Sequence, residues 1–128
     1  MASLTNYLTN ALLDHVLRNV PYSSPDDVYL ALFTTATDAT GAGTEVAGGD
    51  YARQLLVFNV AGDPGDPVRN GDNVTFDGMP AATVTHVAIF DDPDAGHMLF
   101  QAEMVTPKTV ATGDTLTFAP GDIEVALA

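Results

Sequence analysis

Residues 28–35 read Val28-Tyr29-Leu30-Ala31-Leu32-Phe33-Thr34-Thr35, a run of strand-forming residues that is apolar at odd and even positions alike. Side chains alternate between the two faces of a strand, so a strand that is apolar on both faces has to be covered on both sides. The run therefore predicts the central strand of the core. The next segment, residues 36–50, has no aromatic and no basic side chain. We interpret it as a long solvated loop displayed by a rigid scaffold.

The N-terminal region predicts a helix from about residue 4 to residue 19. Apolar residues recur there at intervals of three and four, as in an amphipathic helix: Leu4, Tyr7, Leu8, Ala11, Leu12 and Val16. Ser3 is the expected N-cap, Asp14 and Arg18 are spaced to pair on the exposed side, and Pro21 ends the helix. The polar face lacks the basic residues of a membrane-surface helix, so we expect the apolar stripe to pack on a sheet.

From Val28 onward the sequence predicts strands separated by turns rich in glycine, proline and aspartate. The candidates are residues 28–35, 52–59, 73–76, 84–90, 97–104, 115–118 and 123–127. The clearest hairpin joins 84–90 to 97–104 through the turn 91–96, and a second turn, 119–122, joins the last two strands. The pattern predicts a mainly β (α+β) fold, an antiparallel β-sandwich or a jelly-roll-like barrel with the N-terminal helix packed on it. Residues 1–128 are expected to form a single domain with a β core over about 28–127.

Charge limits the partners of this chain. Seventeen acidic residues face four basic ones, Arg18, Arg53, Arg69 and Lys108, for a net charge of −13. Such a surface repels phosphate backbones, so we expect no nucleic-acid partner. Most of the acids are aspartates, and because salt screens their repulsion we hypothesise a marine or halophilic source. No apolar run reaches the about 18 residues of a membrane span, and no signal peptide is recognisable, so we expect synthesis in the cytoplasm and no membrane partner.

The sequence offers no recognisable catalytic constellation. Its serines, Ser3, Ser23 and Ser24, stand at an expected helix cap and in an expected turn, without a base beside them. Among so many aspartates, a pair at glycosidase spacing would arise by chance. The glycines of 41–49 are followed by no lysine and no helix start, as a phosphate-binding loop would require. We therefore expect no enzyme and no cofactor.

The best candidate for a cation site is the acidic turn with Asp91, Asp92 and Asp94, because calcium prefers carboxylate oxygens. Counted from Asp92, the EF-hand pattern fails, since Gly96 and His97 stand at its fifth and sixth positions. We predict ordinary turn chemistry there and no metal site, and leave cation binding open. The other histidines, His15 and His86, are expected at the edge of the core.

Several stretches together resemble a family of small virion proteins of tailed bacteriophages. They are residues 4–8 and 11–18 (LTNYL and ALLDHVLR), 28–34, 43–46, 48–49, 51–53, 85–91, 106–110 and 113–116, which span nearly the whole length. Members of this family are described as capsid decoration or as minor-tail and tail-fibre proteins. The resemblance therefore implies a structural virion protein. This chain departs from the family in its extra aspartates and in the proline-rich insert 62–68, which leaves the loop contacts open.

On this basis we predict a capsid decoration (cement) protein that binds the outer shell and stabilises it. Its partners would be the major capsid protein and further copies of the chain, with a trimer as one oligomer. The alternative is a minor-tail or tail-fibre-associated module for host recognition, which would use the loops 36–50 and 61–72. The docking face should be the least acidic one, and our candidates are Tyr51, Arg53, Pro107 and Lys108. It stays open whether Arg53 and Lys108 instead pair with aspartates inside the domain.

Overall fold

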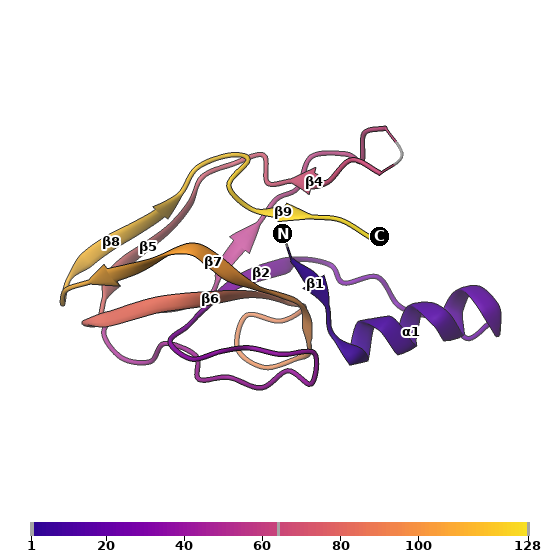
Figure 1. Ribbon diagram of the computed structural model, residues 1–128, viewed down its shortest axis with the longest axis horizontal. Helices are drawn as coiled ribbons and strands as arrows, with labels where there is room; N and C mark the ends of the chain where they lie inside the picture. The colour runs from indigo at the N-terminus through magenta and orange to yellow at the C-terminus, as the bar shows by residue number, and fades with distance from the viewer. Residues whose placement is uncertain (1, 64, 128) are drawn as a thin grey trace.

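The computed structural model describes residues 2–63 and 65–127. In it the predicted central strand is β2 (Val28–Phe33), which lies between β6 (Ala82–Phe90) and β3 (Gln54–Leu56) (Figure 1). With β1 (Ser3–Leu4) and β7 (Met98–Val110) these strands form a five-stranded antiparallel sheet in the order β1-β7-β6-β2-β3. Leu30, Ala31, Leu32 and Phe33 are all buried. Both faces of β2 are therefore covered, as predicted.

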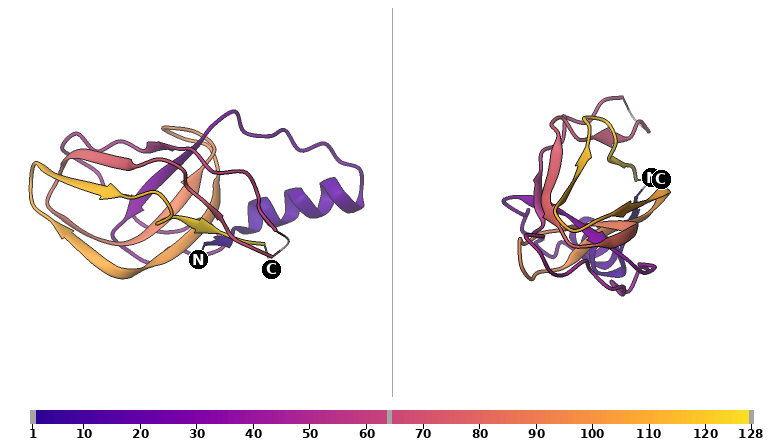
Figure 2. Two further views of the ribbon diagram at one scale, coloured as in Figure 1. Left: turned by 90° about the horizontal axis from the view of Figure 1, so that it is seen from above. Right: turned by 90° about the vertical axis from the view of Figure 1, so that its left-hand side faces the viewer.

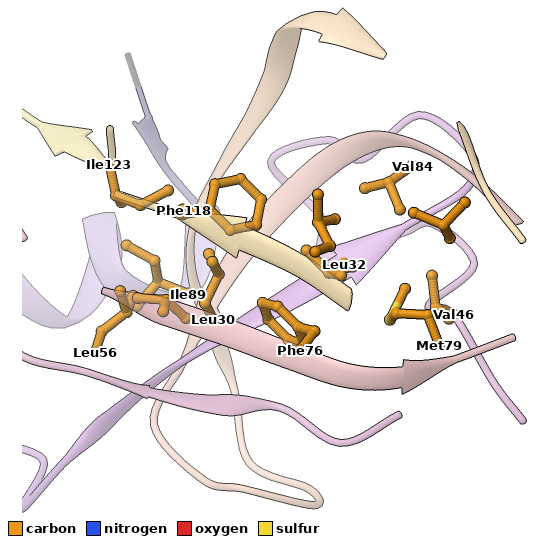
Figure 3. Packing of buried hydrophobic residues seen from close by; sticks show 13 residues of the cluster. Leu30, Leu32, Val46, Leu56, Phe76, Met79, Val84, Ile89, Phe118 and Ile123 are labelled. Carbon is orange, nitrogen blue, oxygen red and sulfur yellow. The ribbon is translucent and has the colours of Figure 1, made fainter. Parts of the chain in front are cut away.

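One face of this sheet is covered by a second layer, the antiparallel pair β5 (Val74–Met79) and β8 (Asp114–Phe118). The main core lies between the layers and includes Leu30, Leu32, Phe76, Ile89 and Phe118 (Figure 3). The fold is mainly β and antiparallel, as predicted, with one helix near the N-terminus. Within the described residues the strands close no barrel, so of the two predicted architectures the layered one fits.

The segment 36–50, predicted to be a long solvated loop, is a mostly exposed loop that runs beside the end of β2 and approaches Phe33 and Met98 on the other face of the sheet. Val46 N donates to Leu32 O over 2.8 Å and Thr34 N donates to Thr44 O over 2.9 Å, so the segment folds back along β2. A Cβ atom on Gly43, whose φ is +130°, would lie 2.9 Å from the Phe33 ring. The small residues of this segment thus allow its backbone to approach the sheet closely. The prediction of a solvated loop is confirmed for most of the segment, in which only Thr37 and Val46 are buried.

The predicted helix exists as α1 (Asn6–Leu17), but only the N-terminal part of its apolar stripe packs on the sheet. Leu8 is buried, whereas 51% of Leu13, 74% of Val16 and 74% of Leu17 are exposed. The reason is the short β1, which pairs with the edge of β7, so that the helix starts at the sheet margin and projects away from it (Figures 1 and 2).

The cap of α1 also differs from the prediction. Ser3 belongs to β1, and Thr5 is the N-cap. The buried Thr5 hydroxyl accepts a hydrogen bond from Leu8 N over 3.4 Å and donates to Met98 O over 2.6 Å. The predicted Asp14–Arg18 pair is present at 3.0 Å.

The predicted hairpin is confirmed, because β6 and β7 pair along their length around the turn 91–96. The turn 119–122 is also present, with Asp122 N donating to Ala119 O over 3.0 Å. The strands on either side of it do not pair with each other, contrary to our expectation. Instead β8 pairs with β5, and β9 (Glu124–Val125) pairs with β4 (Val68–Arg69). The two-residue strands β1 and β4 were not predicted, because segments so short carry no visible alternation.

The two ends of the described chain meet. Ala2 forms a parallel bridge with Val125, and Ala2 N donates to Glu124 O over 3.2 Å. This contact connects the β4–β9 pair to the five-stranded sheet. The segment between β3 and β4 makes an exposed excursion, in which Val60 is 92% exposed.

Candidate functional site

Arg53, one of the predicted docking residues, is held inside the fold. Its guanidinium donates from Nη2 to Glu45 Oε1 (2.9 Å) and from Nε to Glu45 Oε2 (3.0 Å), and from Nη1 to the carbonyls of Asp92 (3.0 Å) and Ala95 (2.8 Å). It also stacks 3.7 Å above the Phe90 ring, and 9% of the side chain is exposed. Arg53 therefore fastens the segment 36–50 and the turn 91–96 to the sheet. Its acidic partner is Glu45, whereas the alternative given in the sequence analysis was pairing with aspartates inside the domain.

Tyr51 belongs to the same cluster. Its hydroxyl donates to Glu45 Oε2 over 2.7 Å and accepts from Leu32 N over 3.0 Å. Burial is the main cause that raises the pKa of the Tyr51 phenol above its ordinary value, and the bond to Glu45 adds to it. Tyr51 and Arg53 thus share one carboxylate and hold the interior together.

Pro107 and Lys108 lie at the far end of β6, because Lys108 pairs with Val84 whereas Arg53 stacks on Phe90. Six residues of strand separate those two positions, which corresponds to about 20 Å. The four predicted docking residues therefore fall into two separate pairs. Pro107 and Lys108 are exposed, and in the described part of the chain Lys108 forms no ion pair.

Lys108 ends a large bulge in β7. Val84 pairs with Lys108 and His86 pairs with Glu103, so three residues of β6 face six residues of β7. The extra residues push outward, and Val105 is fully exposed. Our predicted strand stopped at Met104, where this bulge interrupts the alternation of side chains.

Beside the bulge, a cavity of about 370 Å³ opens between β7 and β8. Its apolar lining comes from both layers, and its charged rim is formed by Glu103, Lys108, Asp122 and Glu124. Figure 2 shows the two layers diverging on this side of the molecule. Sequence reasoning missed this groove because its walls come from segments distant along the chain. Lys108, chosen for its charge, is the single predicted docking residue that lines it.

The acidic turn 91–96 shows the predicted turn chemistry. Asp92 Oδ1 accepts from the backbone N–H groups of Asp94 and Ala95, both over 2.9 Å, and Asp91 Oδ1 accepts from His97 N over 2.7 Å. These bonds lower the pKa of Asp92. Across residues 2–63 and 65–127, no three acidic or histidine side chains converge as metal ligands would.

The histidines occupy three different surroundings. His97 stacks on Tyr7 with ring centroids 3.9 Å apart, beside a smaller cavity of about 270 Å³. His86 is partly buried and bonds to the hydroxyl of Thr85 over 2.8 Å, in line with its predicted place at the core edge. His15 is exposed and bonds to Val20 O over 3.1 Å, so the corresponding prediction for it is wrong, because α1 leaves the sheet before that point.

Comparison with known proteins identifies the family of the chain. A search of curated proteins gives no match. No helix within the described residues has the length and apolar character to cross a membrane. One family model, described as "Podophage GP4 fiber I protein gp80", matches residues 3–126. The resemblance to small virion proteins of tailed phages is thereby confirmed, and the chain is a structural component of a virion. With nearly its whole length matched, the chain belongs to the family of the podophage GP4 fibre I protein gp80.

Proposed function

We propose that this protein is a building module of a fibre on the outside of a phage particle, and that it acts by holding neighbours in place and not by catalysis. The observation that carries the proposal is the family match over residues 3–126, because that family is described by a fibre protein. This favours our alternative, the tail-fibre reading, over capsid decoration.

The build of the molecule supports a passive mechanical role. The central strand β2 is buried on both faces, and Arg53 connects two segments outside the strands to the sheet through four hydrogen bonds. Such a scaffold resists local opening, because its loops share bonds with the core. A net charge of −13 keeps particles that carry the protein dispersed.

Several copies in one fibre would make a modest affinity per contact sufficient. A homo-oligomer, the trimer included, and binding to the major capsid protein stay predictions.

Location on the virion distinguishes the fibre from the shell. Antibody fragments raised against the protein should label fibres in electron micrographs of purified virions. Quantitative gels should give far fewer copies of this protein than of the major capsid protein. Uniform labelling of the capsid shell, with as many copies of this protein as of the major capsid protein, would contradict the proposal.

A role in host recognition can be tested on phage that lack the protein. The exposed residues 61–63 and 65–66 are the better candidate for receptor contact, since part of the segment 36–50 is held beside β2 by hydrogen bonds. Particles without the protein should lose adsorption to host cells while their heads withstand heating like those of the parent phage. Normal adsorption combined with fragile heads would instead favour capsid decoration.

A further inference from the structure

The groove between β7 and β8 is flanked by two strand edges that are free in the described structure. Among the residues that the structure describes, β8 pairs over 114–118 with β5 on one side and with no strand on the other. β7 pairs with β1 through Phe100 and Gln101, and within residues 2–63 and 65–127 no strand joins that side beyond Gln101. Unpaired N–H and C=O groups on such edges are a template for an added strand.

The floor of the groove is apolar and belongs to the core. It includes Leu30, Ile89, Phe100, Met104, Leu116 and Phe118, which come from both layers. Figure 3 shows Leu30, Ile89 and Phe118 converging from the two sides. The cavity of about 370 Å³ therefore has room for a few small apolar side chains above a preformed surface.

The two edges differ in their capacity to pair. The β7 edge is broken by the bulge between Glu103 and Lys108, and Pro107 within it has no N–H to donate. The β8 edge reads Asp114-Thr115-Leu116-Thr117-Phe118, without proline and with Leu116 and Phe118 turned inward. The irregularity of this pair falls on β5, between Phe76 and Met79. A new strand can therefore pair with β8, whereas β7 forms the opposite wall.

Charge selects the kind of occupant. Three acidic residues, Glu103, Asp122 and Glu124, and one basic residue, Lys108, line the groove. Glu124 already pairs with Arg69 over 2.9 Å, so the remaining acids, Glu103 and Asp122, outnumber Lys108. The connecting segments 36–50 and 60–67 of the chain itself contain acids and no lysine or arginine, so a second copy would bring like charge to this rim. An extended segment with lysine or arginine on its outer face would complement it.

We propose that the β8 edge accepts one extended segment of a different protein, which adds as a strand in the groove, with small apolar side chains inward and basic side chains toward the rim. This inference goes beyond the fibre assignment and stands or falls on the purified protein alone. Added strands of this kind gain affinity from main-chain bonds and specificity from alternate side chains.

The test uses the whole purified chain and a synthetic peptide of about ten residues that alternates valine with lysine, long enough to extend past both ends of β8. Titration followed by NMR should shift the amide signals of residues 114–118, 102–106 and 108, and hydrogen exchange of the outward amides of β8 should slow. A matched peptide with glutamate in place of lysine should not bind. Equal binding of both peptides, or shifts spread over the whole surface, would overturn the proposal.

A pair of charge variants distinguishes binding in the groove from general electrostatic attraction of the peptide to an acidic protein. Glu103 is exposed and forms no ion pair among the described residues, so Glu103→Lys should leave the fold intact. It should weaken binding of the lysine peptide about tenfold, because it reverses one charge at the rim. Asp26→Lys makes the same change of net charge outside the groove and should weaken binding by less than about twofold.

Equal loss in the two variants would overturn the proposal. Sedimentation of the protein without peptide tests whether a second copy of the chain occupies the groove. A dimer that the lysine peptide dissociates would mean that a second copy fills the groove, and would also overturn the proposal.

Discussion

At the residue scale, Arg53 is the side chain on which most separate parts of the fold depend. It contacts Glu45, the carbonyls of the turn 91–96 and the ring of Phe90 at once. Lysine keeps the charge but has neither the planar fork nor the stacking surface of arginine. Arg53→Lys should therefore lower the free energy of unfolding by about 2 kcal/mol, measured by urea titration.

The matched control is Arg18→Lys, because Arg18 pairs with Asp14 while 70% of its side chain is exposed. That change should stay within about 0.5 kcal/mol of the parent protein. If both variants lost the same stability, the contacts of Arg53 would contribute no more to the free energy of unfolding than those of the exposed Arg18.

Tyr51 makes stability depend on alkaline pH. Its phenol has a raised pKa in the folded protein, so above the unfolded value of about 10 the unfolded chain releases a proton that the folded protein still holds. Stability from this group is thus complete below pH 10 and falls as the pH rises further, by at most about 1.4 kcal/mol per pH unit.

Tyr51→Phe should reduce this alkaline slope in urea titrations at a series of pH values. It should also lower stability at neutral pH by about 1 to 3 kcal/mol, since Leu32 N loses its acceptor. Tyr7→Phe, which alters an exposed ring, serves as the control and should leave the slope unchanged. An unaltered slope in Tyr51→Phe would refute the assignment.

Gly49 is required by a close approach of two backbone segments. A Cβ on Gly49 would lie 2.6 Å from Gly78 O, and its φ is +55°. Gly113 has a comparable φ of +86° with nothing within 4 Å of such a Cβ. Gly113→Ala should cost about 1 kcal/mol for backbone strain alone, and Gly49→Ala about 1 to 2 kcal/mol more. Similar thermal shifts for the two variants would show that the contact with Gly78 is relaxed in solution.

At the scale of elements, α1 is anchored at one end. Leu8 is buried at its N-terminal turn, and Leu17 is exposed near its C-terminus. Leu8→Ala should therefore lower stability by about 2 to 4 kcal/mol, and Leu17→Ala by less than about 0.5 kcal/mol. Urea unfolding of the two variants checks this. A large effect of Leu17→Ala would mean that the distal half of the helix packs on something in solution.

Local pattern predicted the strands well and their partners less well. The uninterrupted apolar run in 28–35 and the alternation in 84–90 located β2 and β6, because both patterns are visible in neighbouring residues. The same reasoning misplaced the stripe of α1, since the three-and-four spacing does not reveal that β1 holds the helix at a sheet margin. It correctly predicted a solvated loop over 36–50, but it did not reveal that Glu45 and Val46 in that loop contact β2.

The candidate site was predicted only in part for the same reason. Lys108 was chosen by its charge, and it does line the groove. Arg53 was chosen on the same ground and proved to be internal, because its partner Glu45 and its ring Phe90 are brought to it by tertiary pairing. Neither the bulge in β7 nor the free edge of β8 leaves a mark in the sequence, as both are properties of strand pairing.

At the scale of the whole molecule, the excess of negative charge should make stability depend on salt. Ions screen the mutual repulsion of the acids, so the free energy of unfolding should rise as sodium chloride is increased from low to about molar concentration. This prediction also tests the hypothesis of a marine or halophilic source. Urea titrations at several salt concentrations measure the free energy of unfolding. A value that does not change with salt would contradict the screening argument and the hypothesis of a marine or halophilic source.

The control for this salt effect is pH. Near the isoelectric point of about 4.1 the net charge vanishes, so the gain from salt should shrink there. A gain of equal size at both pH values would point to salting out and not to screening.

The bridge between Ala2 and Val125 makes this chain nearly a ring. A short peptide could join the two ends, and the ring could then be cut in the exposed excursion at 61–63 without severing any of the labelled strands. Such a circular permutant would keep every strand pair while it moved the points of attachment to another corner of the molecule. The order in which the strands are synthesised is thus separable from the order in which they pair.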